Sequence, residues 1–452
     1  MSDAPNSPPP SGSPAPRTRA EEDSPSPNPN PVDEPAATVT PTLPRVRGAF
    51  IFGLVAATFG VMMAIILPTA FSLSVVLERI APGREQMLGG IAAAGALAGM
   101  LSGPAAGVWS DRTRSRHGRR RPFLLGGLVV GVAGSVVLAF AGNVGMLYAG
   151  WIVANLGLGT SVAALLNIQA DRLPEEQRGR VAGLTGFAGM TAPVLGVALA
   201  SALGGDQRML FLVPGAVATV CIVAFGLLMK DPDTRDHAQV PLSFGTVAAK
   251  YVFDPRKHPA FAWNWLGRIV FFMGISGSTT FTTFFFAQRL DMPVHEVAGV
   301  VASLSVLGIG GGIIGNIGSG YLSDKVKRRR VFILAGAMAI AAGSVVTALA
   351  GGVLGIAVGL LITNFGIGVF SAVDQAIVLD VLPERDTDAG RYMALMAFSQ
   401  GIPNILAPLI AGYVITIGAG EGAKNYTLLF LLTGAFALIG AAIIHTKVKS
   451  VR

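Results

Sequence analysis

Two charged side chains lie well inside long apolar stretches of this sequence, Arg268 within residues 263–288 and Asp374 within residues 353–382. An ionisable group in an apolar environment is costly, so such residues usually face a cavity or a charged partner. Arg268 and Asp374 can pair with each other, and a carboxylate that loses its partner in one conformational state can take up a proton. Three roles fit this placement: coupling to protons or to a substrate, a fixed structural ion pair, or a water-exposed position near a helix end.

Amide side chains on neighbouring apolar stretches can complete a polar site around this pair. Amides both donate and accept hydrogen bonds, as recognition of a hydroxylated solute requires. With Asp374 and Arg268, the predicted substrate or coupling residues are Gln375, Asn167, Gln169, Gln400 and Asn404. Each amide taken singly also fits an interhelical hydrogen bond, which is the common role of such side chains in membranes.

The sequence offers little for other kinds of chemistry. The single cysteine, Cys221, and five scattered histidines provide no ligand spacing for a metal. A nucleotide-binding motif is absent from the sequence, and the basic residues are spread over many segments without an aromatic platform for nucleic acid. We therefore predict no catalytic residues, no metal site, no cofactor, no nucleic-acid partner and no enzymatic activity.

Long apolar stretches dominate the chain and predict an all-α membrane protein. The mean hydropathy is +0.59, and only 13% of the 452 residues are charged. Crossing about 30 Å of hydrocarbon takes about 20 apolar residues in a helix. Twelve stretches of this kind are predicted to span the membrane: 48–77, 86–110, 122–141, 145–171, 180–204, 208–229, 263–288, 294–322, 331–351, 353–382, 390–417 and 424–446.

Positive charge is concentrated on one side of the predicted spans. Of the 34 Lys and Arg residues, 28 lie in segments on that side, which is predicted to be cytoplasmic. Both termini then lie in the cytoplasm of a cell whose plasma (inner) membrane holds the chain, in contact with anionic lipid. The predicted domains are a disordered cytoplasmic tail at 1–44, a six-helix bundle at 45–229, a cytoplasmic linker at 230–262, a second bundle at 263–446 and a tail at 447–452.

An internal repeat supports the division into two halves. The stretch "GVWSDR" (107–112) matches "GYLSDK" (320–325), and each is followed by three consecutive arginines, at 119–121 and at 328–330. The arginine triplets are 209 residues apart, whereas the two motifs are 213 apart, so the first copy holds four extra residues. Parallel six-helix repeats in a transporter place a substrate site between the halves, near the middle of the membrane.

These motifs resemble the loop signature G-x-x-x-D-R-x-x-R-R of the major facilitator superfamily. The matching residues are Gly107, Asp111, Arg112, Arg119 and Arg120 in the first half, and Gly320, Asp324, Lys325, Arg328 and Arg329 in the second. More narrowly, "GPAAGVWSDRTRSRHGRRRPF" (103–123) is similar to the corresponding loop of plant sucrose-proton symporters and related glycoside-cation symporters.

The resemblance implies two six-helix bundles, alternating access and a gating role for the charged loops. Asp111 would face the start of the span at 390, and Asp324 the start of the span at 180, when the transporter faces outward. The loop arginines, Arg121 included, would pair with acids at neighbouring helix ends such as Asp171 and Asp380. The expected partners are a small solute, protons and membrane lipids, with one chain as the functional unit.

Two functions compete on these grounds. The first is proton symport of a sugar or glycoside, and the second is export of amphipathic compounds, which suits Phe-rich segments such as "FTTFFF" (281–286). Plant sucrose symporters carry an Asp in the fourth span and an Arg in the fifth. Here the corresponding charges, Asp171 and Arg180, lie at the ends of those spans, so sucrose itself is not assigned.

Overall fold

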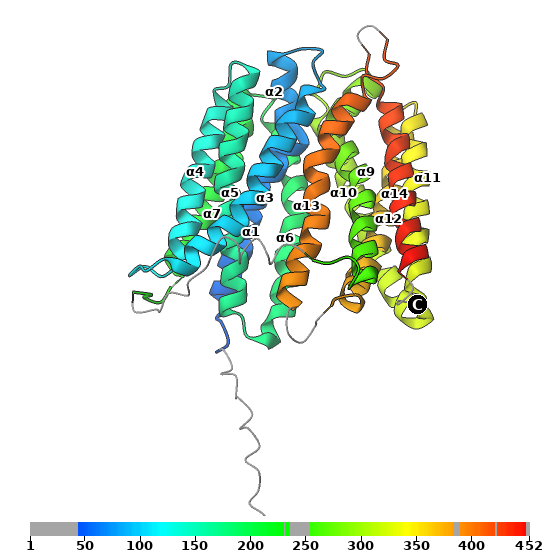
Figure 1. Cartoon of the computed structure of the whole chain (residues 1–452). Coiled ribbons are helices and arrows are strands. Elements are labelled where there is room, and N and C mark those ends of the chain that lie inside the picture. Colours follow the sequence, from blue (N-terminus) through cyan, green and yellow to red (C-terminus); the bar gives the residue numbers. More distant parts are fainter. Residues whose placement is uncertain (1–43, 230, 236–252, 384–388, 421–422, 449–452) are drawn as a thin grey trace, which may run out of the picture. The chain divides into compact units, whose positions relative to one another are not determined.

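The computed structural model describes residues 44–229, 231–235, 253–383, 389–420 and 423–448. Within these residues the secondary structure is helical, and twelve helical segments are long and apolar enough to cross a membrane (Figure 1). The prediction of an all-α membrane protein with twelve spans is therefore confirmed. Residues 1–43, 236–252 and 449–452 hold most of the predicted tails and linker, and they lie outside the described residues.

Within each half, the helices follow one another with short connections. In the first half they are α1 (Gly48–Leu67), η1 (Pro68–Ser72), α2 (Leu73–Ile80), α3 (Met87–Arg112), α4 (Arg121–Ala139), α5 (Val144–Arg172), α6 (Glu175–Ala202) and α7 (Gln207–Leu228). In the second half they are α9 (Pro259–Leu290), α10 (Ala298–Val326), α11 (Arg329–Leu349), α12 (Val353–Asp380), α13 (Ala389–Val414) and α14 (Tyr426–Lys447). The segments α1, η1 and α2 form one continuous span, in which η1 is a π-helical turn that begins at Pro68. Proline lacks the N–H that the α-helical ladder needs, which accounts for the local change of winding.

Two helices begin earlier than the hydropathy of the sequence indicates. Helix α6 starts at Glu175 instead of residue 180, and α9 starts at Pro259 instead of residue 263. The first turn of α6 contains Glu175 and Glu176, whose negative charge is favourable at a helix N-terminus. Pro259 occupies the first turn of α9, where its missing N–H costs nothing. A hydropathy profile does not detect first turns that begin with such residues.

Glycine contacts repeat between the two halves at the spacing of 209 residues. A Cβ added to Gly127 of α4 would lie 2.7 Å from the Gly157 carbonyl oxygen of α5. A Cβ added to Gly336 of α11 would lie 3.0 Å from the Gly366 carbonyl oxygen of α12. Small residues allow helices in a membrane to approach closely. The internal repeat in the sequence is thus a repeat of helix packing.

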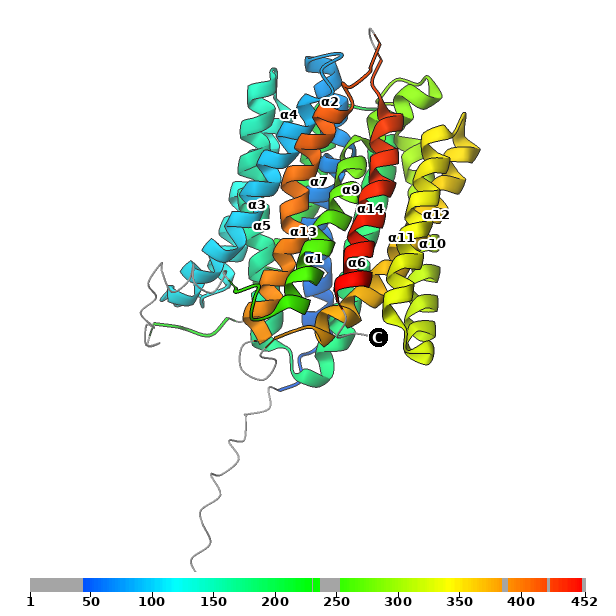
Figure 2. The same cartoon turned by 45° about the vertical axis from the view of Figure 1, so that its right-hand side comes forward.

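The two halves meet along the helix pairs α3–α13 and α6–α10 (Figure 1 and Figure 2). We call the end that holds the residue 111–121 loop and the start of α11 the arginine-rich end. At the opposite end, a Cβ on Gly89 would lie 2.1 Å from the Pro408 carbonyl oxygen, and one on Gly412 would lie 2.7 Å from the Gln86 carbonyl oxygen. The halves are therefore in tight contact away from the arginine-rich end.

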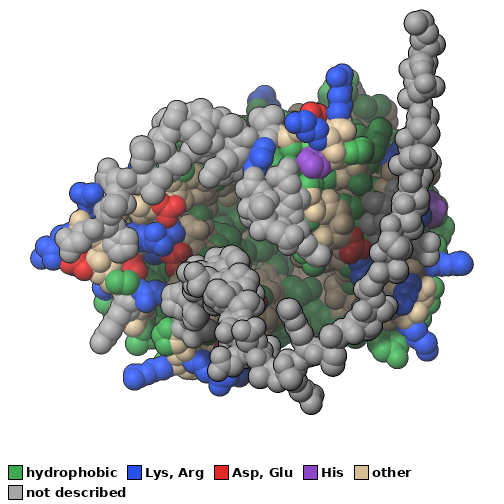
Figure 3. All heavy atoms as spheres, turned by 60° about the horizontal axis from the view of Figure 1, so that its bottom comes forward, with side chains coloured by type: hydrophobic (Ala, Val, Ile, Leu, Met, Phe, Trp, Pro, Cys, Tyr) green, Lys and Arg blue, Asp and Glu red, His purple; other side chains and the backbone are tan. Residues whose placement is uncertain are grey.

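Toward the arginine-rich end the helices leave more room. Among the described residues, a Cβ added to Gly183 or Gly186 of α6, or to Gly318 of α10, would meet no atom within 4 Å. Figure 3 looks onto this end, where Lys and Arg side chains lie around the rim and hydrophobic side chains are visible between them. The described conformation thus combines a tight end with a more open, positively charged end.

Candidate functional site

A cavity of about 800 Å³ lies between the two halves. Its walls come from α1, η1, α3 and α5 of the first half and from α9, α12 and α13 of the second. Cavities of about 300–1,000 Å³ are typical of small-molecule sites. The polar lining residues are Thr69, Asn155, Arg268, Ser276, Thr279, Thr280, Ser371, Asp374, Gln375, Gln400 and Asn404.

Arg268 and Asp374 form a buried ion pair in the wall of this cavity. Arg268 is 7% exposed and Asp374 is 5% exposed. The Arg268 Nη1 group donates a hydrogen bond to Asp374 Oδ2, which joins α9 to α12. The Arg268 Nε group donates to the Ser399 hydroxyl of α13 at 2.8 Å. One guanidinium therefore holds three helices of the second half together.

The same pair has one unused acceptor and one aromatic neighbour. Among the described residues, the buried Asp374 Oδ1 atom has no hydrogen-bond partner. A buried carboxylate oxygen without a partner is costly, so it favours a proton or a donor from a ligand. The Arg268 guanidinium also lies 5.5 Å from the centre of the Phe272 ring, which lines the cavity. The pair can thus bind a further donor without being rebuilt.

The arginine-rich end of the first half contains a denser charge network. Arg120 is 6% exposed, and its Nε group donates to Asp171 Oδ2 at 2.8 Å. Its Nη2 group lies 2.9 Å from Asp111 Oδ1, and its Nη1 group donates to the Ser110 hydroxyl. Arg119 adds a hydrogen bond from Nη2 to Asp171 Oδ2 at 3.0 Å. The pairing of loop arginines with Asp171 that the sequence predicts is therefore present.

Asp231, in the segment that follows α7, anchors the loop to this network. Its carboxylate accepts hydrogen bonds from the backbone N–H groups of Arg120 and Arg121, at 2.8 and 3.1 Å, and from the Arg172 side chain at 3.2 Å. Gly118 makes the approach possible, because its φ is +81° and a Cβ there would lie 2.1 Å from the Asp231 Cγ atom. The glycine before the arginine triplet is thus required by conformation and by space.

In the part of the second half that the structure describes, the equivalent ion pair is more exposed. Arg329 Nη1 donates to Asp380 Oδ2, which is the second predicted pairing, and the two side chains are 27% and 40% exposed. Lys325 and Arg328 lie on the surface. The Asp324 side chain lies outside the described residues.

The model of the Major Facilitator Superfamily matches residues 46–389 and 319–449. The chain belongs to this superfamily. Among curated proteins, Multidrug resistance protein 2 of Bacillus subtilis (strain 168) is 20% identical over 356 residues, which cover 78% of this chain and 84% of that protein. Inner membrane transport protein YajR of Escherichia coli (strain K12) is 30% identical over 169 residues, which cover 35% of this chain and 36% of that protein.

Solved structures show the same fold. A crystal structure of the nucleoside transporter NupG superposes with a TM-score of 0.69 at 11% identity, covering 88% of this chain and 99% of that chain. A bacterial homologue of the human lysosomal transporter Spinster, in an inward-facing and unoccupied conformation, gives a TM-score of 0.62 at 17% identity and covers 90% and 98%. The chain is therefore a multi-pass membrane transporter of this superfamily.

The structure of this transporter brings five of the seven predicted coupling residues to the cavity. Those five are Arg268, Asp374, Gln375, Gln400 and Asn404. Asn167 and Gln169 are not among the residues that line this cavity, so their role at the site stays a prediction. They follow Asn155, which does line the cavity, by twelve and fourteen residues on α5, so they lie roughly 20 Å closer to the arginine-rich end.

In this conformation the Asp111 side chain pairs with Arg119 and Arg120 of its own half, at 3.6 and 2.9 Å. The contacts with the other half, which the resemblance implies for an outward-facing state, stay a prediction. Gly107 has no atom within 4 Å of an added Cβ among the described residues, and the nearest such atom to Gly320 is at 4.0 Å. Both motif glycines therefore have room beside them in this conformation.

Several cavity residues carry no clear signal in the sequence. Trp151 is 2% exposed and lines the cavity, and its Nε1 atom has no hydrogen-bond partner among the described residues. Ser276 donates to Asn404 Oδ1 at 2.7 Å, which links α9 to α13. The helical spacing of Arg268, Phe272, Ser276 and Thr279–Thr280, at three or four residues, is the pattern that identifies this face of α9.

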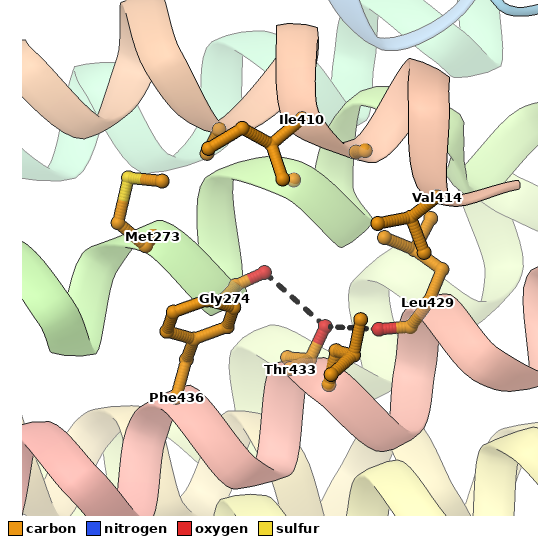
Figure 4. A pocket seen from close by; sticks show the side chains of 11 residues that line it. Met273, Gly274, Ile410, Val414, Leu429, Thr433 and Phe436 are labelled. Atoms are coloured by element: carbon orange, nitrogen blue, oxygen red, sulfur yellow. Dashed lines mark hydrogen bonds between the residues drawn. The ribbon is translucent and has the colours of Figure 1, made fainter.

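A second, much smaller cavity lies between α9, α13 and α14 (Figure 4). Its volume is about 20 Å³, and its walls are mostly apolar. The Thr433 hydroxyl lies 3.2 Å from the Gly274 carbonyl oxygen and 3.1 Å from the Leu429 carbonyl oxygen. This space holds about one water molecule, so it is a packing gap and is too small for a solute.

Proposed function

We propose that this chain is a secondary active transporter that moves a small polar solute, a sugar or glycoside, in symport with protons. The observation that carries the proposal is the Arg268–Asp374 pair in the cavity wall, with Asp374 Oδ1 unpartnered among the described residues. A proton on Asp374 removes the charge that holds Arg268, so protonation changes how α9 and α12 attract each other. Asp374 is then the coupling acid, and Arg268 is its charged counterpart.

The distribution of charge supports an orientation for the proposal. Lys and Arg are retained in cytoplasmic loops, so the arginine-rich end faces the cytoplasm of a plasma (inner) membrane, and both termini lie there. The tight contacts between Gly89 and Pro408 and between Gly412 and Gln86 then lie at the outer end. The described conformation is accordingly the one that is closed to the outside and open to the cytoplasm.

The lining of the cavity favours a hydroxylated solute. Gln375, Gln400 and Asn404 supply amide donors and acceptors, and Trp151 and Phe272 supply apolar ring surfaces. A sugar presents both hydroxyl groups and apolar C–H faces, so it matches this mixture. The similarity of residues 103–123 to the loop of glycoside-cation symporters points the same way.

The charged loops are proposed to set the balance between conformations. In the outward-facing state Asp111 leaves Arg119 and Arg120 for the start of α13, where the helix dipole favours a carboxylate. The Arg329–Asp380 pair acts in the second half. Asp111→Asn is expected to shift the population toward the cytoplasm-open state; unchanged uptake together with an unchanged population would refute this gating role.

Export of amphipathic compounds is the second candidate. The relative called Multidrug resistance protein 2 matches 78% of this chain, which favours it. An apolar groove of about 650 Å³ between α3, α4 and α5, lined by Leu101, Trp109, Phe123 and Val130 among others, also offers an apolar compound a place to bind.

Purified protein in sealed proteoliposomes separates the two candidates. We expect a radiolabelled phenyl glucoside to exchange in counterflow and to accumulate when the outside is acidic, whereas ethidium does not. Asp374→Asn keeps exchange and loses accumulation, while Asp254→Asn, on an exposed loop residue that contacts the Arg256 N–H, behaves as wild type. Accumulation by Asp374→Asn at the wild-type level overturns the coupling role, and pH-dependent ethidium extrusion supports the exporter.

A further inference from the structure

A second carboxyl outside the cavity joins the two halves at the outer end. Glu85 lies in the turn between α2 and α3, and the Tyr426 hydroxyl at the start of α14 donates a hydrogen bond to its Oε2 atom. Tyr426 is 2% exposed, and its ring packs against Phe285 of α9 at 6.3 Å between centres. A carboxyl of the first half is therefore held by a buried, fixed hydroxyl of the second half.

The surrounding contacts make this point part of the seal between the halves. Next to Glu85 in the chain, the Gln86 carbonyl oxygen faces Gly412 of α13, and one turn into α3 Gly89 faces the Pro408 carbonyl. Nearby, the Thr283 hydroxyl of α9 donates to the Ala70 carbonyl of η1 at 2.5 Å. Opening the outer end requires all of these contacts to separate, and the Glu85–Tyr426 bond separates with them.

The charged groups that face Glu85 leave its negative charge poorly compensated. Glu78 of α2 repels it, and one buried oxygen of Glu78 has no hydrogen-bond partner among the described residues. Lys424, in the segment before α14, is the opposing positive charge, and its backbone is tied to Gln288 of α9 by two hydrogen bonds of 3.0 and 3.1 Å. Burial, followed by repulsion from Glu78, raises the pKa of Glu85 from 4.5 to about 7, and Lys424 offsets only part of that rise.

We propose that Glu85 is a proton-binding site of the outer gate, at which a proton from outside removes a buried negative charge and so stabilises the contact between the two halves beside Tyr426. When the gate opens, Glu85 meets water and its acidity returns toward the ordinary value. Closing therefore takes up a proton, and loss of that proton favours opening. Glu85 acts separately from Asp374, because it lies in the seal and does not line the cavity.

The sign of the pH dependence follows from linkage. The closed state has the higher pKa, so closure is fully favoured below the ordinary pKa of a glutamate and weakens as the outer pH rises through about 7. Each pKa unit is worth tenfold, so full deprotonation weakens the closed state on the order of 100-fold. The outer gate is thus stabilised by acid outside, which is also the condition that drives proton symport. This inference rests on the proposed orientation and function of the chain.

Distance measurements between spin labels at the outer mouth test the proposal without any solute. Gly142 and Gly351 are equivalent in the repeat, and a Cβ added to either meets no atom of the described residues within 4 Å. The full chain carries Gly142→Cys and Gly351→Cys in a Cys221→Ala background and is reconstituted in lipid nanodiscs. We expect the closed population to fall as the pH rises from about 4.5 to about 7, with a midpoint inside that range, and to change little at higher pH.

Four variants decide the origin of the response. Glu85→Gln is expected to abolish it, and Glu78→Gln to move its midpoint to lower pH because the repulsion on Glu85 is gone. Asp291→Asn, on the exposed residue after α9, is the matched control and keeps the wild-type response. Asp374→Asn removes the proposed coupling acid and is expected to leave the part of the response that Glu85 causes. A response retained in both Glu85→Gln and Asp291→Asn but lost in Asp374→Asn overturns the gate site and leaves the proposed coupling role intact. A wild-type distance that does not change with pH overturns the proposal as well.

If Glu85→Gln fails to fold, the midpoint of the response in Glu78→Gln decides. A midpoint equal to that of the wild type refutes the proposal.

Discussion

The two halves of this transporter share one helical frame but not one set of charges. Gly127 and Gly157 in the first half and Gly336 and Gly366 in the second make the same close helix contacts, 209 residues apart. Asp374 of the second half forms a buried pair with Arg268, whereas the equivalent position in the first half is Leu165, which is 2% exposed. The close glycine contacts thus occur in both halves, whereas Asp374 has no acidic equivalent in the first half. This difference fits a role of Asp374 in coupling better than a role in helix packing.

At the arginine-rich end, the charged residues of the first half are the more buried ones. In the first half Arg120 is buried and contacts Asp111, Asp171 and Ser110, and Asp231 ties down the backbone of the loop. In the second half Arg329 and Asp380 form a partly exposed pair. The first loop, which is four residues longer, turns at Gly118 and contacts Asp231. Among the described residues, the first half thus has the more buried clasp, and the second half has the buried pair of Arg268 and Asp374.

The largest expected effect comes from breaking the buried pair on one side. Arg268→Met leaves Asp374 uncompensated among apolar neighbours, and we expect the free energy of unfolding to fall by about 3–5 kcal/mol, measured by denaturant unfolding in lipid micelles. The double variant Arg268→Met with Asp374→Leu removes both charges, as the first half does naturally at Leu165, and recovers most of the loss. A double variant as unstable as the single one would mean that the Arg268–Asp374 pair itself contributes this free energy of unfolding, and that apolar residues do not replace it.

The first-half clasp comes next. Arg120→Met removes three side-chain contacts to Asp171, Asp111 and Ser110, and we expect a loss of about 2–3 kcal/mol because hydrogen bonds to charged groups are involved. Arg116→Met, on an exposed residue of the same loop, is the matched control with little expected effect. The same unfolding measurement checks both variants. Equal stability of the two would show that the clasp does not contribute to the folded state.

The glycine of the loop is expected to have a smaller but separable effect. Gly118→Ala places a Cβ at a positive φ, which costs roughly 1–2 kcal/mol, and pushes it into Asp231. Gly83 also has a positive φ, of +74°, but a Cβ there meets no atom within 4 Å in the part of the chain that the structure describes, so Gly83→Ala measures the conformational cost alone. We expect Gly118→Ala to be the more destabilising of the two, and Asp231→Ala to remove the difference. If the two glycine variants are equally stable, Asp231 does not hold the loop.

Much of this molecule follows from patterns that repeat along the chain. Twelve apolar stretches of helical length predict twelve spans, and the matched motifs around Asp111 and Asp324 predict two halves, because both signals depend on local composition and spacing. The pair of Arg268 and Asp374 was also predictable, since few other charges lie inside the apolar stretches. The sequence predicts starts for α6 and α9 that lie after the observed ones, Glu175 and Pro259. The reason is that a helix can begin with polar residues, which a hydropathy profile does not distinguish from a loop.

The remaining parts of the site depend on contacts between distant segments. Asp231 joins the clasp across more than one hundred residues, and Tyr426 meets Glu85 across 341. A lone acid in a short turn gives no local sign of its partner. Asn167 was expected at the site because it is polar and within a span, but polarity does not report depth along the helix, and the cavity ends nearer to Asn155.

The smallest expected effect comes from the second-half pair. Arg329→Met removes the contact with Asp380, and because both side chains are partly exposed we expect a loss of less than about 1 kcal/mol in dilute buffer. In 1 M NaCl the Debye length falls to about 3 Å, so the difference from wild type should nearly vanish. The Arg120→Met loss should persist in the same salt, because Arg120 is 6% exposed. Equal salt sensitivity of the two variants would mean that burial does not distinguish the Arg120 contacts from the Arg329–Asp380 pair. The difference between the halves would then lie only in the Arg268–Asp374 pair.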